Sequence, residues 1–216
     1  MFVIFYIMLI ITIKSRYFFT LILLISIIAG CTKKTPALPL LSNDSVVLAF
    51  GDSLTYGYNV TKNKSYPALL QKLTGLKVIN AGISGEVSEE GLARFPKVLN
   101  DYNPKLVILC HGGNDLLRKM DIEEMESNIR AMIQLSLDRK IPLILLGVPK
   151  PGIFLSSADV YKEIASSMNT IFMEDLVSNV LSDKLLKSDS IHPNENGYNV
   201  MAEEIYSLLL DSGAIK

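Results

Sequence analysis

VVLAFGDSL, residues 46–54, is a continuous apolar run that ends at Gly51 and leads directly into a serine. Short apolar runs closed by a turn residue are typical of strands buried on both faces of a parallel sheet. Comparable runs follow at residues 76–79, 105–110 and 141–148, with a shorter one at residues 170–172. The sequence therefore predicts five strands, of which the run before Gly51 is the first.

Stretches with helical features separate these runs. The clearest is residues 122–139, where apolar residues recur at helical spacing. Ser88 is expected to cap a second helix, and Pro96 to kink or divide it. This second helix is expected at residues 88–99. Three further helices are expected at residues 65–73, 158–168 and 196–210. Strands that alternate with helices specify a three-layer α/β/α fold with a mostly parallel sheet, here one domain over residues 45–216.

The chain opens with two apolar stretches separated by positive charge. Lys14 and Arg16 stand between residues 2–13 and the apolar residues 17–30. A basic region before an apolar stretch of that length is typical of a signal peptide and is short for a membrane span. The sequence Ile-Ala-Gly-Cys that ends at Cys31 resembles the lipobox of bacterial lipoproteins. This pattern predicts a lipoprotein-type signal peptide over residues 1–30 and lipidation of Cys31.

Several acyl chains on one residue would anchor the protein stably in a membrane. We therefore expect an exported protein held at the periplasmic face of a membrane, with a polar, proline-containing tether over residues 31–44. The alternatives are an uncleaved anchor and an ordinary secretory signal, which would give a soluble periplasmic or secreted protein. The extra run at residues 2–13 has two explanations: a true start at Met8, or a longer helix interrupted by charge.

Composition narrows the range of partners. The 216 residues carry a formal net charge of −1, which offers no basic patch for nucleic acid. The two cysteines, Cys31 and Cys110, offer no disulfide framework, and Cys110 is expected to be a buried strand residue. No cluster of cysteine and histidine indicates a metal, so neither a metal nor another cofactor is predicted.

Four short motifs carry groups suited to chemistry, and three of them follow predicted strands. The motifs are Gly51–Leu54, Asn80–Gly85, Gly112–Asp115 and the late segment Asp189–Pro193. Sites in open parallel sheets gather beyond the carboxyl ends of the strands. A serine at such a turn is exposed, and Asp189 precedes His192 closely enough to reach its ring. Taken one at a time, these motifs are also compatible with turn glycines, helix caps and a surface histidine.

In order and position the four motifs resemble the four blocks of the SGNH/GDSL hydrolase family, from residue 46 to the final helix. Tyr66–Leu70 and Gly91–Arg94 also look like its bacterial branch of small periplasmic thioesterases, arylesterases and lysophospholipases. The resemblance implies a flavodoxin-like sheet and a serine esterase that forms an acyl-enzyme. We expect its substrate to be a small-molecule ester, a thioester or a lysolipid.

The resemblance also implies roles for individual residues. Ser53 is expected to be the nucleophile, His192 the general base, and Asp189 the group that orients His192. The backbone N–H groups of Ser53 and Gly85 and the side chain of Asn114 are expected to form the oxyanion hole.

Other residues near the motifs are interpreted as structural. Gly82 is expected to form a turn, and Asp52 and Asp115 to make structural hydrogen bonds. His111 is the only other histidine, and it lacks a carboxylate three residues before it, so it is the weaker candidate for the base.

The loop at residues 149–156 departs from this branch of the family and leaves the acyl preference open. A carbohydrate acetylesterase is therefore an alternative function. A non-catalytic lipoprotein that binds lipid or cell wall on the same fold is a second alternative, because fold alone does not decide activity.

Overall fold

The computed structural model describes residues 37–150, 152 and 155–216, so the predicted leader (residues 1–30) and Cys31 lie outside the described residues. The strands are β1 (Val46–Gly51), β2 (Lys77–Gly82), β3 (Leu106–Cys110), β4 (Leu143–Leu146) and β5 (Ile171–Met173). The helices are α2 (Ser53–Tyr56), α3 (Tyr66–Thr74), α4 (Ser88–Tyr102), α5 (Gly113–Leu117), α6 (Ile122–Asp138), α7 (Asp159–Ser167), α8 (Leu176–Ser182) and α9 (Glu195–Asp211), with a 3-10 turn η1 (Lys62–Lys64). Within these ranges, no helix combines the length and the apolar character needed to cross a membrane.

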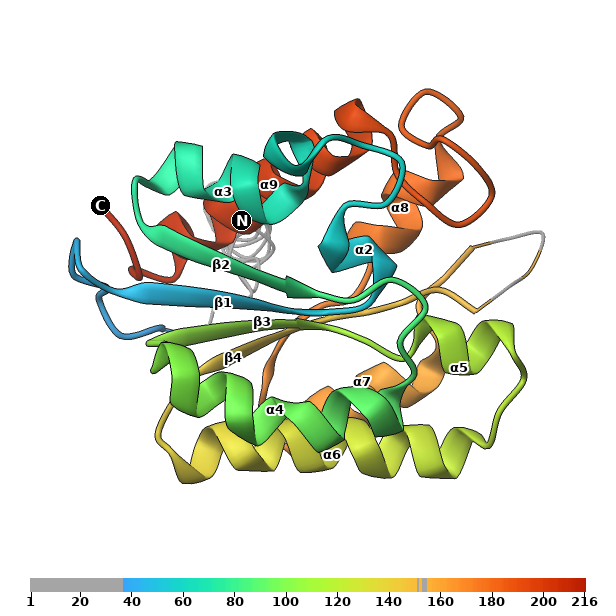
Figure 1. Cartoon of the computed structure of the whole chain (residues 1–216), viewed down its shortest axis with the longest axis horizontal. Coiled ribbons are helices and arrows are strands. Elements are labelled where there is room, and N and C mark those ends of the chain that lie inside the picture. Colours follow the sequence, from blue (N-terminus) through green and yellow to red (C-terminus); the bar gives the residue numbers. More distant parts are fainter. Residues whose placement is uncertain (1–36, 151, 153–154) are drawn as a thin grey trace, which may run out of the picture. The chain divides into compact units, whose positions relative to one another are not determined.

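The five strands form one parallel sheet in the order β2-β1-β3-β4-β5 (Figure 1). This is the flavodoxin-like order, in which winding reverses beside β1 and β3. The central strands are buried throughout their apolar parts, residues 47–50 and 106–110. Their unbroken apolar sequence follows from cover on both faces, and the predicted fold class is confirmed.

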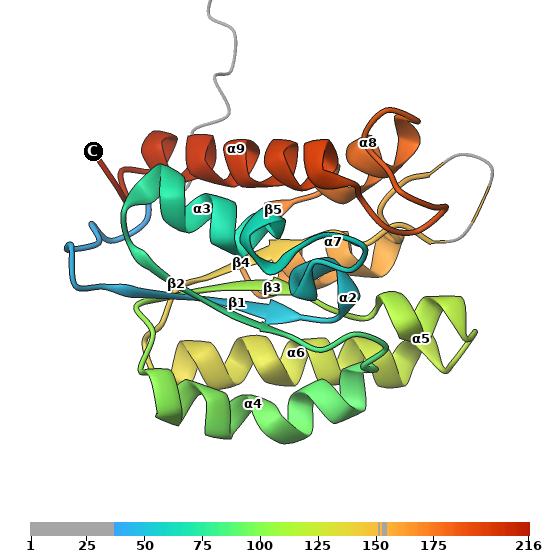
Figure 2. The same ribbon diagram turned by 45° about the horizontal axis from the view of Figure 1, so that its top comes forward.

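Helices cover both faces of the sheet, as Figures 1 and 2 show. α3, α8 and α9 pack on one face, and α4, α6 and α7 pack on the other. Each helix turns an apolar side chain toward the sheet, for example Leu70, Phe95, Ile129 and Ile205, all of them fully buried. The carboxyl ends of the strands therefore lie at one edge of a closed core, where loops and short helices surround them.

Three short helices at this edge do not appear in the sequence-based expectation. α2 and α5 have four and five residues, too few for a helical period to be visible in the sequence. α8 has seven residues and lies in a segment for which no element was predicted. Tertiary contacts hold them in place: α2 packs on β1 and β2, α5 on α6, and α8 on α9.

The helix α4 differs from its expected form in two respects. It runs unbroken from Ser88 to Tyr102, so the expected division at Pro96 is wrong. Pro96 removes one backbone donor, but burial of Phe95 and Leu99 on either side keeps the helix continuous. Ser88 is the first helical residue rather than the cap, and its N–H donates to the Asp115 carboxylate.

The folded part begins earlier than the predicted boundary at residue 45. Leu38 and Leu41 are each 9% exposed. Their backbone N–H groups donate to the carbonyl oxygens of Ser212 and Ala214 at 3.0 and 2.8 Å. The predicted tether over residues 31–44 is therefore wrong from Leu38 onward, because these leucines bury themselves against the end of the chain.

Candidate active site

Ser53 is the first residue of α2 and lies directly beyond the carboxyl end of β1. Asp52 caps this helix, with Oδ1 accepting a hydrogen bond from the Leu54 N–H at 3.0 Å. The Asp52 carboxyl is almost fully buried, and this desolvation raises its pKa above the ordinary value. Asp52 thus fixes the turn that presents Ser53, which agrees with the structural role expected for it.

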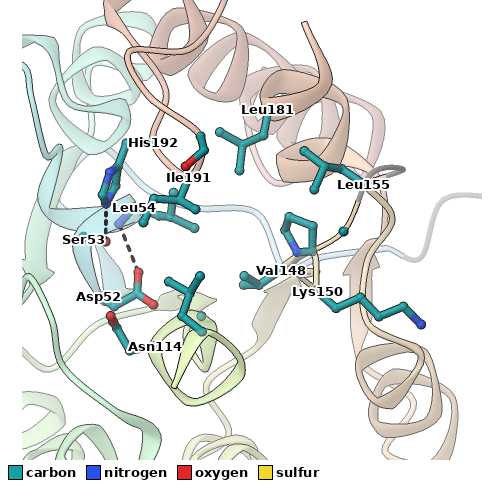
Figure 3. Close-up of a pocket in the computed structure, with 15 residues that line it drawn as sticks. Asp52, Ser53, Leu54, Asn114, Val148, Lys150, Leu155, Leu181, Ile191 and His192 are labelled. Carbon is teal, nitrogen blue, oxygen red and sulfur yellow. Dashed lines mark hydrogen bonds between the residues drawn. The ribbon is translucent and has the colours of Figure 1, made fainter. Parts of the chain in front are cut away.

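The structure brings Ser53, His192 and Asp189 together. His192 Nε2 lies 3.0 Å from Ser53 Oγ, and Figure 3 shows the ring pointing at the serine. His192 Nδ1 lies 2.9 Å from Asp189 Oδ2 and 3.1 Å from Oδ1. Burial alone would raise the pKa of Asp189, but hydrogen bonds from the Ile191 N–H and from His192 lower it overall. Asp189 is therefore an anion facing one nitrogen of His192 while the other nitrogen faces Ser53.

The three expected oxyanion donors are Ser53 in α2, Gly85 in the turn between β2 and α4, and Asn114 in α5. The N–H groups of Ser53 and Gly85 bond to no acceptor among the described residues. Gly85 has a φ of +83°, a conformation that glycine adopts without strain. Asn114, in the first turn of α5, donates one N–H of its amide to the Glu86 carbonyl oxygen at 2.9 Å. Its second amide N–H makes no bond within the described ranges, so each expected donor has an N–H to offer.

The loops that carry Gly85 and Asn114 are tied together. Arg118 donates to the Gly85 carbonyl oxygen at 2.7 Å. The Asp115 carboxylate accepts from the Ser88 N–H at 2.9 Å and from the Ser88 hydroxyl at 2.6 Å. These bonds hold the two loops in register, and Asp115 has the structural role expected for it.

A cluster of Glu86, Arg94 and His111 lies next to these loops. Glu86 accepts hydrogen bonds from Arg94 Nε and Nη2, both at 2.6 Å, and lies 3.0 Å from His111 Nε2. His111 Nδ1 accepts the Gly112 N–H at 2.9 Å, so its Nε2 carries the proton that is donated to Glu86. Desolvation would raise the pKa of Glu86, but His111 and Arg94 lower it overall. His111 is fully buried, and both its nitrogens are engaged inside the fold.

A cavity of about 260 Å³ opens beside Ser53. The polar groups of Ser53, Asn114 and His192 gather at one end of it, and the ammonium group of Lys150 points away from them (Figure 3). The apolar lining is made by Leu54, Leu117, Val148, Pro149, Leu155, Leu181 and Ile191. Such a cavity suits a hydrophobic group that is joined to a polar reacting centre.

Gly82 is the last residue of strand β2 and pairs with Gly51 of β1, so the turn expected at this position is wrong. The Gly82 N–H donates to Asn80 Oδ1 at 3.0 Å, and a Cβ at Gly82 would lie 2.1 Å from the Tyr56 nitrogen. Close packing against α2 therefore requires glycine at this position. Cys110 is a fully buried residue of β3, as expected, and desolvation raises the pKa of its thiol.

Comparison with known protein families gives a result that agrees with the geometry of this site. The model of the GDSL-like Lipase/Acylhydrolase family matches residues 49–200, a range that includes Ser53, Asn114 and His192. The chain belongs to this family. It is thus an ester-hydrolysing serine hydrolase of the GDSL type, and the expected family is confirmed.

Similar GDSL proteins have ester-cleaving names. Thioesterase 1/protease 1/lysophospholipase L1 of Escherichia coli K12 is 30% identical over 168 residues, which cover 73% of this chain and 79% of that protein. The arylesterase of Vibrio mimicus is 31% identical over 168 residues, which cover 73% and 84%. Esterase EstA from Pseudoalteromonas sp., solved in a form inhibited by monoethylphosphonate, matches with a TM-score of 0.69 at 25% identity. That match covers 77% of this chain and 97% of EstA.

Two residues at the GDSL site were not found by sequence reasoning. Asn59 Nδ2 donates to Asp189 Oδ2 at 3.0 Å, and the rings of Tyr58 and His192 have centroids 4.4 Å apart. Asn59 and Asp189 are 130 positions apart. No local signal connects them, so only the fold reveals the contact.

Proposed function

We propose that Ser53, His192 and Asp189 form the catalytic triad of an esterase that works through an acyl-enzyme. The observation that carries this proposal is the 3.0 Å separation of His192 Nε2 and Ser53 Oγ, with Asp189 at the other ring nitrogen. His192 takes the Ser53 proton as Oγ attacks the carbonyl carbon, and Asp189 stabilises the imidazolium that forms. The alcohol or thiol leaves with that proton. Water then repeats the attack on the acyl-enzyme, which releases the acid and restores Ser53.

In the same proposal, the oxyanion is held by the N–H groups of Ser53 and Gly85 and by the Asn114 amide. This assignment is supported because each of the three residues has an N–H group that bonds to no acceptor among the described residues. The bond from Arg118 to Gly85 keeps one donor fixed. Fixed donors stabilise developing charge strongly because they need no reorganisation during the reaction.

We propose as substrates carboxylic esters and thioesters with an apolar acyl or aryl group, including lysophospholipids. The apolar cavity wall and the thioesterase, arylesterase and lysophospholipase names of the relatives support this class. A panel of a short-chain p-nitrophenyl ester, an acyl-CoA, a lysophosphatidylcholine and an acetylated oligosaccharide tests it. We expect the first three to be cleaved at higher kcat/KM than the sugar. The reverse order would favour a carbohydrate acetylesterase and contradict the proposal.

Removal and covalent labelling of Ser53 test the proposed triad. Ser53→Ala should lower turnover of the p-nitrophenyl ester by on the order of 10⁴-fold or more, with an unchanged unfolding temperature. A p-nitrophenyl ethylphosphonate should transfer its phosphonyl group to Ser53 as p-nitrophenolate leaves, and peptide mass analysis locates the label. Ser190→Ala is the matched control, because Ser190 lines the same cavity and should be dispensable. A label on another serine, or a tenth of the activity left in Ser53→Ala, would contradict the triad.

We also propose that the protein is exported and anchored by lipid on Cys31. The support is the apolar stretch that ends in Ile-Ala-Gly-Cys. Cys31→Ser should move the protein from the carbonate-washed membrane pellet to the soluble fraction. Cys110→Ala, at the buried cysteine, should leave it in the pellet. A Cys31→Ser protein that stays in the pellet would indicate an uncleaved anchor instead.

A further inference from the structure

Asn59 lies in the turn after α2 and faces the loop that carries Asp189. Its side-chain amide donates to Asp189 Oδ2 at 3.0 Å and to Ser188 Oγ at 3.1 Å. The two segments are 130 residues apart in sequence. The Asn59 amide therefore bonds to two consecutive residues of a loop that is distant from it in the sequence.

The Asp189 carboxylate needs such a partner because the backbone N–H groups of its own loop bond to only one of its oxygens. Oδ1 accepts the N–H groups of Ile191 and His192, each at 2.8 Å. Oδ2 faces His192 Nδ1 at 2.9 Å, and the side chain is 39% exposed to solvent. Among the described residues, Asn59 provides the one hydrogen-bond donor that reaches this carboxylate from outside the Asp189–His192 segment. Rotation of the carboxylate away from His192 would break that bond.

The turn that carries Asn59 is itself held in place. Asn59 has a φ of +64°, a left-handed conformation in which asparagine is several-fold enriched among non-glycine residues. The neighbouring Tyr58 ring lies over His192, with centroids 4.4 Å apart and planes tilted by 34°. The Tyr198 hydroxyl donates to the Tyr58 carbonyl oxygen at 3.4 Å. The amide is thus presented from an ordered turn rather than from a free side chain.

We infer that Asn59 is a positioning residue that holds Asp189 Oδ2 against His192 Nδ1. The inference rests on the proposed function, since it assigns Asn59 a part in the same proton transfer. Asn59 does not reach the reacting atoms. As a neutral donor it orients the carboxylate without competing with His192 for its negative charge, as a cationic donor at this position would.

Two substitutions test the inference, both compatible with a left-handed residue. Asn59→Gly removes the amide and should lower kcat by about tenfold with KM within about twofold, because a loosened Asp189 misorients the base. Asn59→Asp keeps the shape but places a second negative charge beside Asp189. The rise of kcat/KM with pH should then move upward by about 0.5–1 pH unit, because added negative charge favours the protonated imidazole.

Asn169→Asp is the matched control for charge and backbone. Asn169 is exposed, has a φ of +49°, and precedes β5 at the amino edge of the sheet. Its pH profile should coincide with that of the unmodified protein. A midpoint unchanged in Asn59→Asp, or moved equally in Asn169→Asp, overturns the positioning role even if kcat falls. The unmodified protein and Ser53→Ala are assayed first, since an inactive unmodified protein or an active Ser53→Ala refutes the proposed function instead.

Discussion

The two histidines of this chain each face a carboxylate, yet the rest of their surroundings differ. His192 lies on a loop before α9, with Asp189 at one ring nitrogen and Ser53 at the other. His111 follows β3 in the buried interior, with Glu86 at one nitrogen and the N–H of its own neighbour at the other. One ring borders a cavity, and the other is fully enclosed by the fold.

The difference teaches that a histidine paired with a carboxylate is not by itself a sign of catalysis. A general base needs one ring nitrogen turned toward the group whose proton it takes. His192 has such a nitrogen, 3.0 Å from a hydroxyl, while both nitrogens of His111 are bonded within the fold. We therefore propose that the first pair serves the reaction and that the second stabilises the loops beside it.

The largest expected effect is the loss of activity in His192→Ala. Turnover should fall on the order of 10⁴-fold, because triad members act together, and adding Ser53→Ala should cost little more. Steady-state assay of the single and double variants with one aryl ester measures this. A His192→Ala protein with near-normal turnover would reverse the comparison and assign the base elsewhere.

Removal of the Asn114 side chain should have the next largest effect. Asn114→Ala should lower kcat by roughly 10²–10³-fold with a smaller change in KM, because an oxyanion donor acts mainly in the transition state. Asn128→Ala is the control. The Asn128 amide donates to Ser88 Oγ, so this substitution removes a loop contact without changing the site itself. A change confined to KM would move Asn114 from the oxyanion hole to substrate binding.

Loss of the buried histidine should affect stability more than activity. His111→Ala should lower the free energy of unfolding by about 2–4 kcal/mol, since it opens a cavity and removes a partner of Glu86. The folded protein should keep kcat within about tenfold of normal. Urea unfolding, combined with assays normalised to phosphonate-reactive serine, separates the two effects. A stable but inactive His111→Ala protein would contradict a purely structural role.

The smallest effect concerns the pH dependence of stability at Glu86. Its pKa is lower in the folded protein than in the unfolded chain, so the unfolded state takes up the proton first as pH falls. The stabilisation that ionised Glu86 contributes is complete above its pKa in the unfolded chain, about 4.3. It is lost as the pH falls through the lower pKa of Glu86 in the folded protein. The stability difference between the unmodified protein and Glu86→Gln should therefore narrow from pH 7 toward pH 3. A difference constant across that range in urea unfolding would show that the charge of Glu86 contributes nothing.

The sequence predicts the layers of this fold well, because burial on both faces leaves long apolar runs such as residues 47–50 and 106–110. It also predicts which motifs gather, since Ser53 and Asn114 follow within four residues of the ends of two strands of one parallel sheet. The pairing of His111 with Glu86, 25 positions away, could not be predicted. Such contacts depend on how loops dock in three dimensions, and docking leaves no periodic trace in the chain. The early start of the domain at Leu38 could not be predicted for the same reason, because it depends on contacts with residues far along the chain.

The hydrogen bonds of Leu38 and Leu41 to the last residues of the chain have a mechanical consequence. Both lie where β1 begins and α9 ends, at the amino edge of the sheet, whereas Ser53 follows the carboxyl end of β1. Any pull on the chain upstream of residue 37 therefore enters the domain at the edge opposite the proposed nucleophile. Six residues separate Cys31 from Leu38, so these two positions are at most about 25 Å apart along an extended chain. With lipid on Cys31, tension from the anchor would load the first strand and the last helical turn, and the loop that holds His192 would carry none of it directly.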